Sequence, residues 1–146
     1  MKFLNHALRV SAVTLAVTAL QAFAASTVGT APSYDPATTV QVVGIVTDVR
    51  QAPTGSPLAG THVILKTKAS TIDVYLAPTD FLKFLKVSFP AGDQIRVSGS
   101  KMKFENADVI LASQVSDGLE LITLRDANGV PDWQHWGQEI DPSLVH

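Results

Sequence analysis

Apolar and polar residues alternate through residues 39–51 in the pattern of a long strand. Three valines occupy even positions up to Val46, and the next apolar side chain, Val49, falls at an odd position. Successive side chains of a strand point to opposite faces, so a change of phase requires an extra residue. The pattern therefore predicts one strand with a bulge or sharp coil near Thr47.

The same alternation predicts further strands, which are separated by loops rich in glycine, proline and hydroxyl residues. The expected strands cover residues 62–67, 71–76, 94–104, 107–116 and 119–124. The strand at 94–104 changes phase after Gly99, and the first strand also has a glycine in its middle, Gly44. A glycine in the middle of a long strand lets the strand bend, and a small closed barrel requires such bends.

One short helix is predicted between the third and fourth strands, at residues 78–86. Pro78 suits the first helical turn, where its missing N–H removes no hydrogen bond. Phe81, Leu82 and Leu85 form one apolar stripe along the helix. The stripe indicates that the helix packs onto the strands on one side.

The order of three strands, a helix and two or three more strands is typical of an OB-fold. We therefore predict an all-β domain with one short helix, an OB-fold-like small barrel of five to six strands at residues 39–136. The helix would plug one open end of the barrel. Residues 25–38 are small, polar and proline-containing and predict a flexible lead-in, and residues 137–146 predict a loose polar tail.

Residues 1–24 have the pattern of a secretory signal peptide. Lys2 and Arg9 give a positive start, an apolar run follows, and Ala22 and Ala24 form the small-x-small cleavage pattern. The apolar run is shorter than the roughly 20 residues that a membrane span needs, although an uncleaved anchor is the alternative. The expected location is periplasmic or secreted, with no stable membrane insertion after cleavage.

Composition narrows the classes of function. The chain has no cysteine, which excludes disulfides, cysteine-ligated metal centres and thiol catalysis. Loss of Lys2 and Arg9 with the signal would leave nine basic residues against thirteen acidic ones, a net charge of about −4. Tight nucleic-acid binding depends on lysine and arginine side chains at phosphates, so nucleic acid is an unlikely partner.

Several segments resemble exported bacterial OB-fold proteins, an uncharacterised periplasmic family. The similar segments are YDPATTVQVVGIVTDV at 34–49, THVILKT at 61–67, VYLAP at 74–78, AGDQIRVSGS at 91–100 and LRDANGVPDW at 124–133. The resemblance implies a ligand-binding or envelope stress role and supplies no catalytic residue. Where those relatives have glycine and often histidine near the end of the third strand, this chain has Tyr75 and Ala77.

A ligand-binding surface is predicted on the face of the second and third strands. OB-folds bind oligonucleotides and sugars there, bordered by the loops after the first and fourth strands. Basic and aromatic side chains are the candidates for this surface: His62, Lys66, Tyr75, Lys101, Lys103 and Phe104. The competing interpretation is a solvated charged face with no ligand.

The sequence gives little support for a metal site, and no cofactor is expected. His62 and His135 are candidate ligands, but no His-x-His or His-x-x-x-His pair exists, whereas zinc needs three or four converging ligands. The segment from Asp126 to Gly129 resembles part of a calcium loop, but its glycine comes too early and a tight turn is the simpler interpretation. Arg125 and Asp126 are expected to pair locally or to cap this turn.

Aromatic residues after the last strand are expected to hold the C-terminal segment against the barrel. These residues are Trp133 and Trp136, with His135 between them. Buried aromatic rings contribute a large apolar area, and exposed rings would instead indicate an interface.

No catalytic machinery is recognisable, since the chain has no Gly-x-Ser-x-Gly motif, no cysteine and no glycine-rich phosphate loop. The sequence favours a non-catalytic binding module for a small ligand, a glycan or an envelope protein. A single-stranded nucleic-acid binder and a metal- or haem-handling protein are the alternatives.

Overall fold

The computed structural model describes residues 31–136. Its elements follow the predicted order, and the strand ends differ from the prediction by at most two residues. The elements are η1 (Pro36–Thr38), β1 (Thr39–Ala52), β2 (Gly60–Lys66), β3 (Thr71–Ala77), α1 (Thr79–Leu85), β4 (Gln94–Phe104), β5 (Ala107–Ser116), β6 (Leu121–Thr123) and η2 (Asp132–His135).

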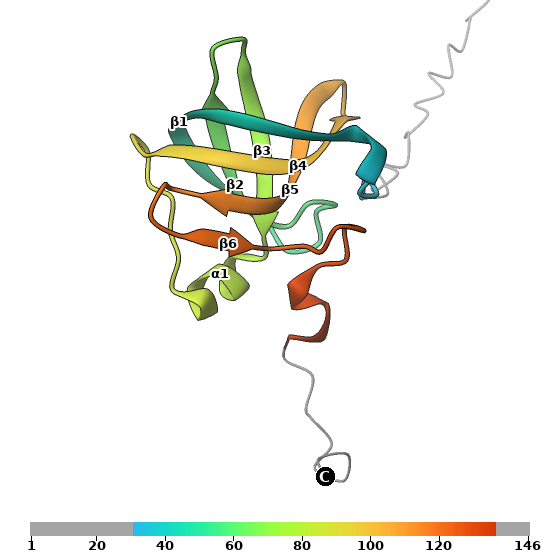
Figure 1. The fold of residues 1–146 in the computed structure, drawn as a ribbon. Coiled ribbons are helices and arrows are strands. Elements are labelled where there is room, and N and C mark those ends of the chain that lie inside the picture. The colour runs from blue at the N-terminus through green and yellow to red at the C-terminus, as the bar shows by residue number, and fades with distance from the viewer. Residues whose placement is uncertain (1–30, 137–146) are drawn as a thin grey trace, which may run out of the picture.

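Five of the strands close into a barrel, and the sixth extends the sheet (Figure 1). The strand order is β3-β2-β1-β4-β5-β6, with antiparallel neighbours throughout. The barrel closes through a parallel pairing of β3 with β5, from Asp73 opposite Val109 to Tyr75 opposite Leu111. This arrangement confirms the predicted OB-fold-like barrel.

One of the two predicted phase changes is a bulge in its own strand. The β1–β2 register shifts between Val46 and Asp48, so Thr47 is the extra residue that the alternation required. The β4–β5 register also shifts between Ser98 and Gly99, but the extra residue is Ser113 on β5, so β4 keeps its alternation and Met102 and Phe104 lie in the outer cluster. Each bulge increases the local twist, which lets a long strand pair with different neighbours along its two halves.

The two mid-strand glycines allow close contact between crossing strands. A Cβ at Gly44 would clash with the carbonyl oxygen of Lys66 on β2. A Cβ at Gly99 would clash with the carbonyl oxygen of Leu111 on β5 and would lie 2.9 Å from the Cα of Ala112. Only a residue without a side chain fits at these positions, because the obstructing atoms belong to strand backbone.

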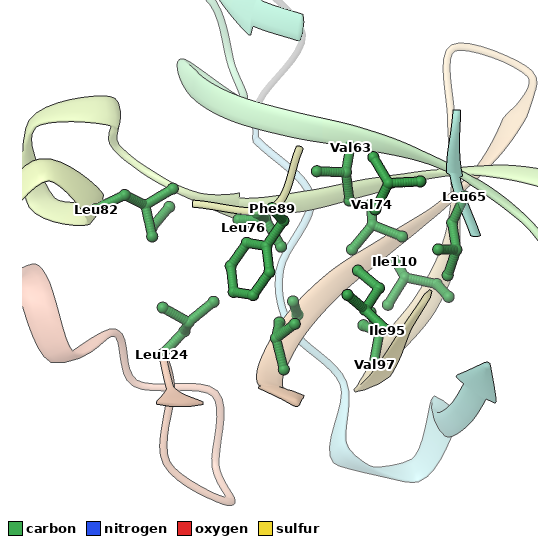
Figure 2. Close-up of a cluster of buried hydrophobic side chains, with 14 of the residues drawn as sticks. Val63, Leu65, Val74, Leu76, Leu82, Phe89, Ile95, Val97, Ile110 and Leu124 are labelled. Carbon is green, nitrogen blue, oxygen red and sulfur yellow. The ribbon is translucent and has the colours of Figure 1, made fainter. Parts of the chain in front are cut away.

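Inward-facing aliphatic side chains from all five barrel strands form the core (Figure 2). Helix α1 adds Phe81 and Leu82, which are buried in the same cluster, so the helix closes one end of the barrel as predicted. A helix of seven residues is too short to be stable alone, and this packing stabilises it. The most deeply buried side chains of the core include Val63, Leu65, Val74, Leu76, Ile95, Val97 and Ile110.

The segment before β1 is tied to the barrel, although its composition predicts a flexible lead-in. The backbone N–H of Asp35 donates to Ser100 Oγ at 3.1 Å, and the hydroxyls of Thr38 and Ser100 lie 2.7 Å apart. The predicted signal peptide and polar tail lie outside the described residues. Within residues 31–136, no helix has the length and apolar character that crossing a membrane would require.

Candidate ligand-binding site

A second apolar cluster lies on the outer surface of β3 and β5, away from the barrel core. Alternation along the strands places Tyr75, Val109 and Leu111 on this face, and Leu58 from the loop after β1 packs onto them. Partly buried side chains from other segments complete the cluster: Tyr34, Met102, Phe104 and Trp133. The barrel face that the sequence predicts as a binding surface is therefore covered by other parts of the same chain.

His62 is buried and bound on both sides of its ring. Its Nε2 donates to the carbonyl oxygen of Leu58 at 2.7 Å, and its Nδ1 lies 2.8 Å from the carboxylate of Asp73. Burial lowers the pKa of His62, but the hydrogen bonds to Asp73 and Leu58 and the charge of Asp73 raise the pKa above its usual value. His62 therefore attaches the loop after β1 to β2 and β3.

Tyr75 holds the same loop. Its hydroxyl donates to the carbonyl oxygen of Ala59 at 3.0 Å, and its ring centroid lies 5.1 Å from that of His62. Burial raises the pKa of Tyr75, and the nearby charge of Arg125 opposes that change. The two predicted site residues on β2 and β3 thus lie together as parts of one buried anchor.

The lysines predicted for this surface lie apart from the aromatic residues, and the predicted site is corrected accordingly. Lys101 and Lys103 alternate with Met102 and Phe104, so the lysines point to the opposite face of β4. Lys103 Nζ lies 2.8 Å from the carboxylate of Asp108, which lowers the pKa of that carboxyl group.

Of the three predicted site residues on β4, only Phe104 belongs to the second apolar cluster. Lys66 is exposed at the end of β2, opposite Ile45 on β1 and Thr71 on β3. Because β1 separates β2 from β4 in the sheet, the basic residues of these two strands do not form one patch.

Arg125 is the residue that sequence reasoning did not place in the site. Its side chain is buried, with 8% of the residue exposed, and it does not pair with Asp126 as the sequence suggested. Its guanidinium carbon lies 4.6 Å from the ring centroid of Trp133 and 5.7 Å from that of Tyr75. Burial lowers the pKa of Arg125, but an arginine remains protonated at neutral pH.

Asp126 caps the turn that follows, which confirms the predicted tight turn. Its Oδ1 accepts the backbone N–H groups of Asn128 and Val130, both at 2.9 Å. Gly129 has φ of +85°, and the Tyr34 ring lies so close to it that a Cβ would clash with the ring. The turn is thereby packed against the segment before β1.

These segments line an open cavity of about 470 Å³ above the second apolar cluster. Leu58, Tyr75 and Leu111 are part of its lining, and Arg125 lies among them. The cavity has the size of a small-molecule site, and its walls are about equally polar and apolar. Its other lining residues come from the segments before β1 and after β6: Ala31, Pro32, Ser33, Tyr34, Asn128, Gly129, Val130, Pro131, Trp133 and Gln134, with Pro57 from the loop after β1.

Trp133 fixes the C-terminal wall of this cavity. Its ring centroid lies 6.4 Å from that of Tyr75, edge to face, and 5.6 Å from that of Phe81 on α1. The expected attachment of the C-terminal segment to the barrel is therefore confirmed at Trp133. Trp136 contacts Phe81 at 5.9 Å and is 41% exposed, whereas the side chain of His135 lies outside the described residues.

A second cavity, of about 260 Å³, lies between α1 and strands β1 to β3. Its walls are mainly aliphatic and include Val49, Leu76 and Leu82, and Lys83 is its one ionisable lining residue. Neither cavity is lined by a cluster of metal ligands: residues 31–136 contain no group of three or more histidine, aspartate or glutamate side chains placed to hold a metal ion.

Comparison with known proteins identifies a family that the sequence reasoning did not name. The model of the MamS/MamX magnetosome protein family matches residues 38–122, which are more than half of the chain and contain the complete five-stranded barrel. No curated protein matches the chain. The matched range ends before Arg125 and Trp133, so the C-terminal wall of the 470 Å³ cavity lies beyond it. On the strength of this match, the chain belongs to the MamS/MamX magnetosome protein family.

Proposed function

We propose that this protein is a non-catalytic, exported binding module that holds a small ligand in the 470 Å³ cavity over β3 and β5. The proposal rests on the presence of this cavity. It lies on the outer face of β3, beside the loop after β1, where OB-folds bind their ligands. Buried hydrogen bonds from His62 and Tyr75 keep that loop in place, so the cavity walls are preorganised for binding.

A small ligand is favoured over an oligonucleotide by the burial of the aromatic residues. Proteins that bind single strands stack successive bases on accessible rings. Here Tyr75 is buried, and Trp133 packs against other rings of the protein. Lys103 and Lys101 both lie close to Asp108, which reduces the charge that they would offer to phosphates.

Family membership supports a role connected with magnetosomes. The signal-like pattern of residues 1–24 supports export of the protein from the cytoplasm. The name of the family also favours metal handling as a second candidate function. Metal titration of the purified protein therefore belongs in the same experiment as the ligand screen.

The test is a thermal-shift screen of the purified protein with four classes of probe: divalent metal ions, neutral sugars, small organic acids and short oligonucleotides. When the ligand concentration is about 100 times the Kd, binding stabilises the folded state by about 2.7 kcal/mol. For a domain of this size, that stabilisation raises the Tm by about 10 °C or more. We expect a small-molecule class to stabilise the protein.

Two substitutions then locate the site. Val130→Trp places a bulky ring at the cavity, at a residue that is 43% exposed and therefore tolerates the change. Val43→Trp is the matched control, 42% exposed on β1, which is not among the strands beneath the cavity. The proposal is wrong if no small molecule stabilises the protein, or if Val130→Trp leaves the stabilisation intact. Processing and export are tested separately, by cell fractionation and N-terminal sequencing of the product.

A further inference from the structure

A buried positive charge without a carboxylate partner lies in the wall of the 470 Å³ cavity. Among residues 31–136, no aspartate or glutamate oxygen lies within 4.0 Å of the guanidinium of Arg125. The nearest acidic residue in sequence, Asp126, uses its carboxylate to cap the turn to Val130. A buried charge without a partner is strongly destabilising, so its retention calls for an explanation.

The hydrogen-bonding capacity of Arg125 is mostly unused within the described part of the chain. A guanidinium carries five N–H donors in a planar fork. Nη1 makes one long hydrogen bond, 3.4 Å to the carbonyl oxygen of Gly129, and Nε is buried with no acceptor. A purely structural arginine would normally donate to a carboxylate or to several carbonyl groups.

The two rings beside Arg125 fix its position without replacing such an acceptor. Trp133 and Tyr75 contact the guanidinium at 4.6 and 5.7 Å from their centroids, which compensates part of the desolvation cost through cation–π attraction. The rings cannot accept in-plane hydrogen bonds from the edge of the fork. They hold Arg125 in one orientation, which lowers the entropy cost of binding a planar anion.

The rest of the lining indicates what kind of molecule carries that anion. Leu58, Tyr34 and Pro131 provide apolar and aromatic surface, and Asn128 and Gln134 bring neutral amide groups. No acidic side chain is among the lining residues. A molecule with one oxyanion group and a partly apolar body therefore matches this mixed lining and the unpaired guanidinium better than a neutral sugar or a cation.

We propose that the cavity binds a small organic anion whose carboxylate or phosphate group accepts hydrogen bonds from Arg125 while its apolar body lies against the aromatic wall. This inference rests on the proposed function, because it names the ligand class of the same site. It places the specificity-determining residue outside the range matched by the family model.

The test is isothermal titration calorimetry on the full chain with benzoate, phenyl phosphate and the neutral isostere benzamide. Benzoate and phenyl phosphate distinguish the two oxyanions, and benzamide tests the need for charge. We expect one of the two anions to bind at least about 30-fold more tightly than benzamide, because the neutral amide leaves the buried guanidinium without a charged partner. Its affinity should fall as salt concentration rises.

Three variants assign the effect to Arg125. Arg125→Met keeps most of the side-chain volume and should weaken anion binding at least about 30-fold, with benzamide affected far less. Arg125→Lys keeps the charge but loses the planar fork and should weaken anion binding by about 10-fold. Arg96→Met removes the same charge from an exposed position on β4 and should change the affinity by less than about twofold.

Circular dichroism establishes whether each variant is folded. If Arg125→Met does not fold, the affinities of Arg125→Lys for the anions and for benzamide decide the outcome. Equal affinities for benzoate, phenyl phosphate and benzamide would overturn the inference, as would anion binding that persists in the Arg125 variants. If neutral sugars bind and Val130→Trp blocks them, the proposed function stands and the anion inference fails. If none of the screened probes binds at all, both fail.

Discussion

The closed barrel makes a sharp prediction at Gly99, where β4 crosses close to β5. In Gly99→Ala, the new Cβ would clash with the carbonyl oxygen of Leu111 and would lie 2.8 Å from the carbonyl carbon of Leu111 and 2.9 Å from the Cα of Ala112. Ordinary contacts of a Cβ begin at 3.4 Å. All three atoms belong to the backbone, so no side-chain rotation removes the overlap.

The loss of stability expected for Gly99→Ala depends on how firmly this part of β5 is held. Leu111 pairs with Ser100 on β4 and, in parallel, with Tyr75 on β3, so its backbone cannot move away without breaking hydrogen bonds on two sides. Overpacking in a core costs about 1–3 kcal/mol when side chains can adjust. Because the backbone must move here, we expect Gly99→Ala to lower the free energy of unfolding by about 3–5 kcal/mol, a large part of the usual 5–15 kcal/mol.

The assay is urea unfolding followed by tryptophan fluorescence and circular dichroism, with Gly118→Ala as the control. Gly118 has φ of +94°, and a Cβ added there would have no heavy atom within 4 Å, so that substitution costs only backbone strain, about 1 kcal/mol. If Gly99→Ala loses no more stability than Gly118→Ala, the close approach of β4 and β5 does not exclude a side chain at position 99. If Gly99→Ala is too unstable to purify while Gly118→Ala folds normally, the prediction stands.

Three further predictions test the anchors around the cavities. The raised pKa of His62 means that its contribution to stability is complete below the unfolded-state value of 6.5 and is lost as pH rises through the folded-state pKa. The wild type should therefore be less stable near pH 9 than near pH 6 by a margin that His62→Gln lacks, measured by urea unfolding at both pH values. Leu82→Ala removes a buried side chain that joins α1 to the core and should cost about 2–5 kcal/mol in the same assay; a loss below about 1 kcal/mol would mean that the helix is not packed as described. Asp126→Ala removes two hydrogen bonds from the turn at the cavity and should cost about 1–3 kcal/mol, with faster amide exchange at Asn128 and Val130 by NMR; unchanged exchange there would contradict the capping role.

The sequence alone determined the local elements of the fold. The phase change at Thr47 and the apolar stripe of α1 each express a constraint between residues close together in the chain, such as strand alternation or helical periodicity. The order of those elements was sufficient to predict an OB-fold-like barrel. The same local rules found the tight turn at Asp126, whose side chain bonds to backbone N–H groups two and four residues further on.

The candidate site depended on contacts between distant parts of the chain, which local patterns do not encode. Strand alternation separates Lys101 and Lys103 from Phe104 locally, but the packing of Phe104 in one cluster with Leu58, Tyr75 and Trp133 depends on the tertiary structure. Arg125 looked like a turn residue beside Asp126. Its burial is decided by Tyr75, which is fifty residues earlier in the chain and reaches it only when β3 pairs with β5 and the segment after β6 folds back over both strands. Whether a charge is solvated or buried depends on what surrounds it in space, and for Arg125 only the tertiary structure supplies those surroundings.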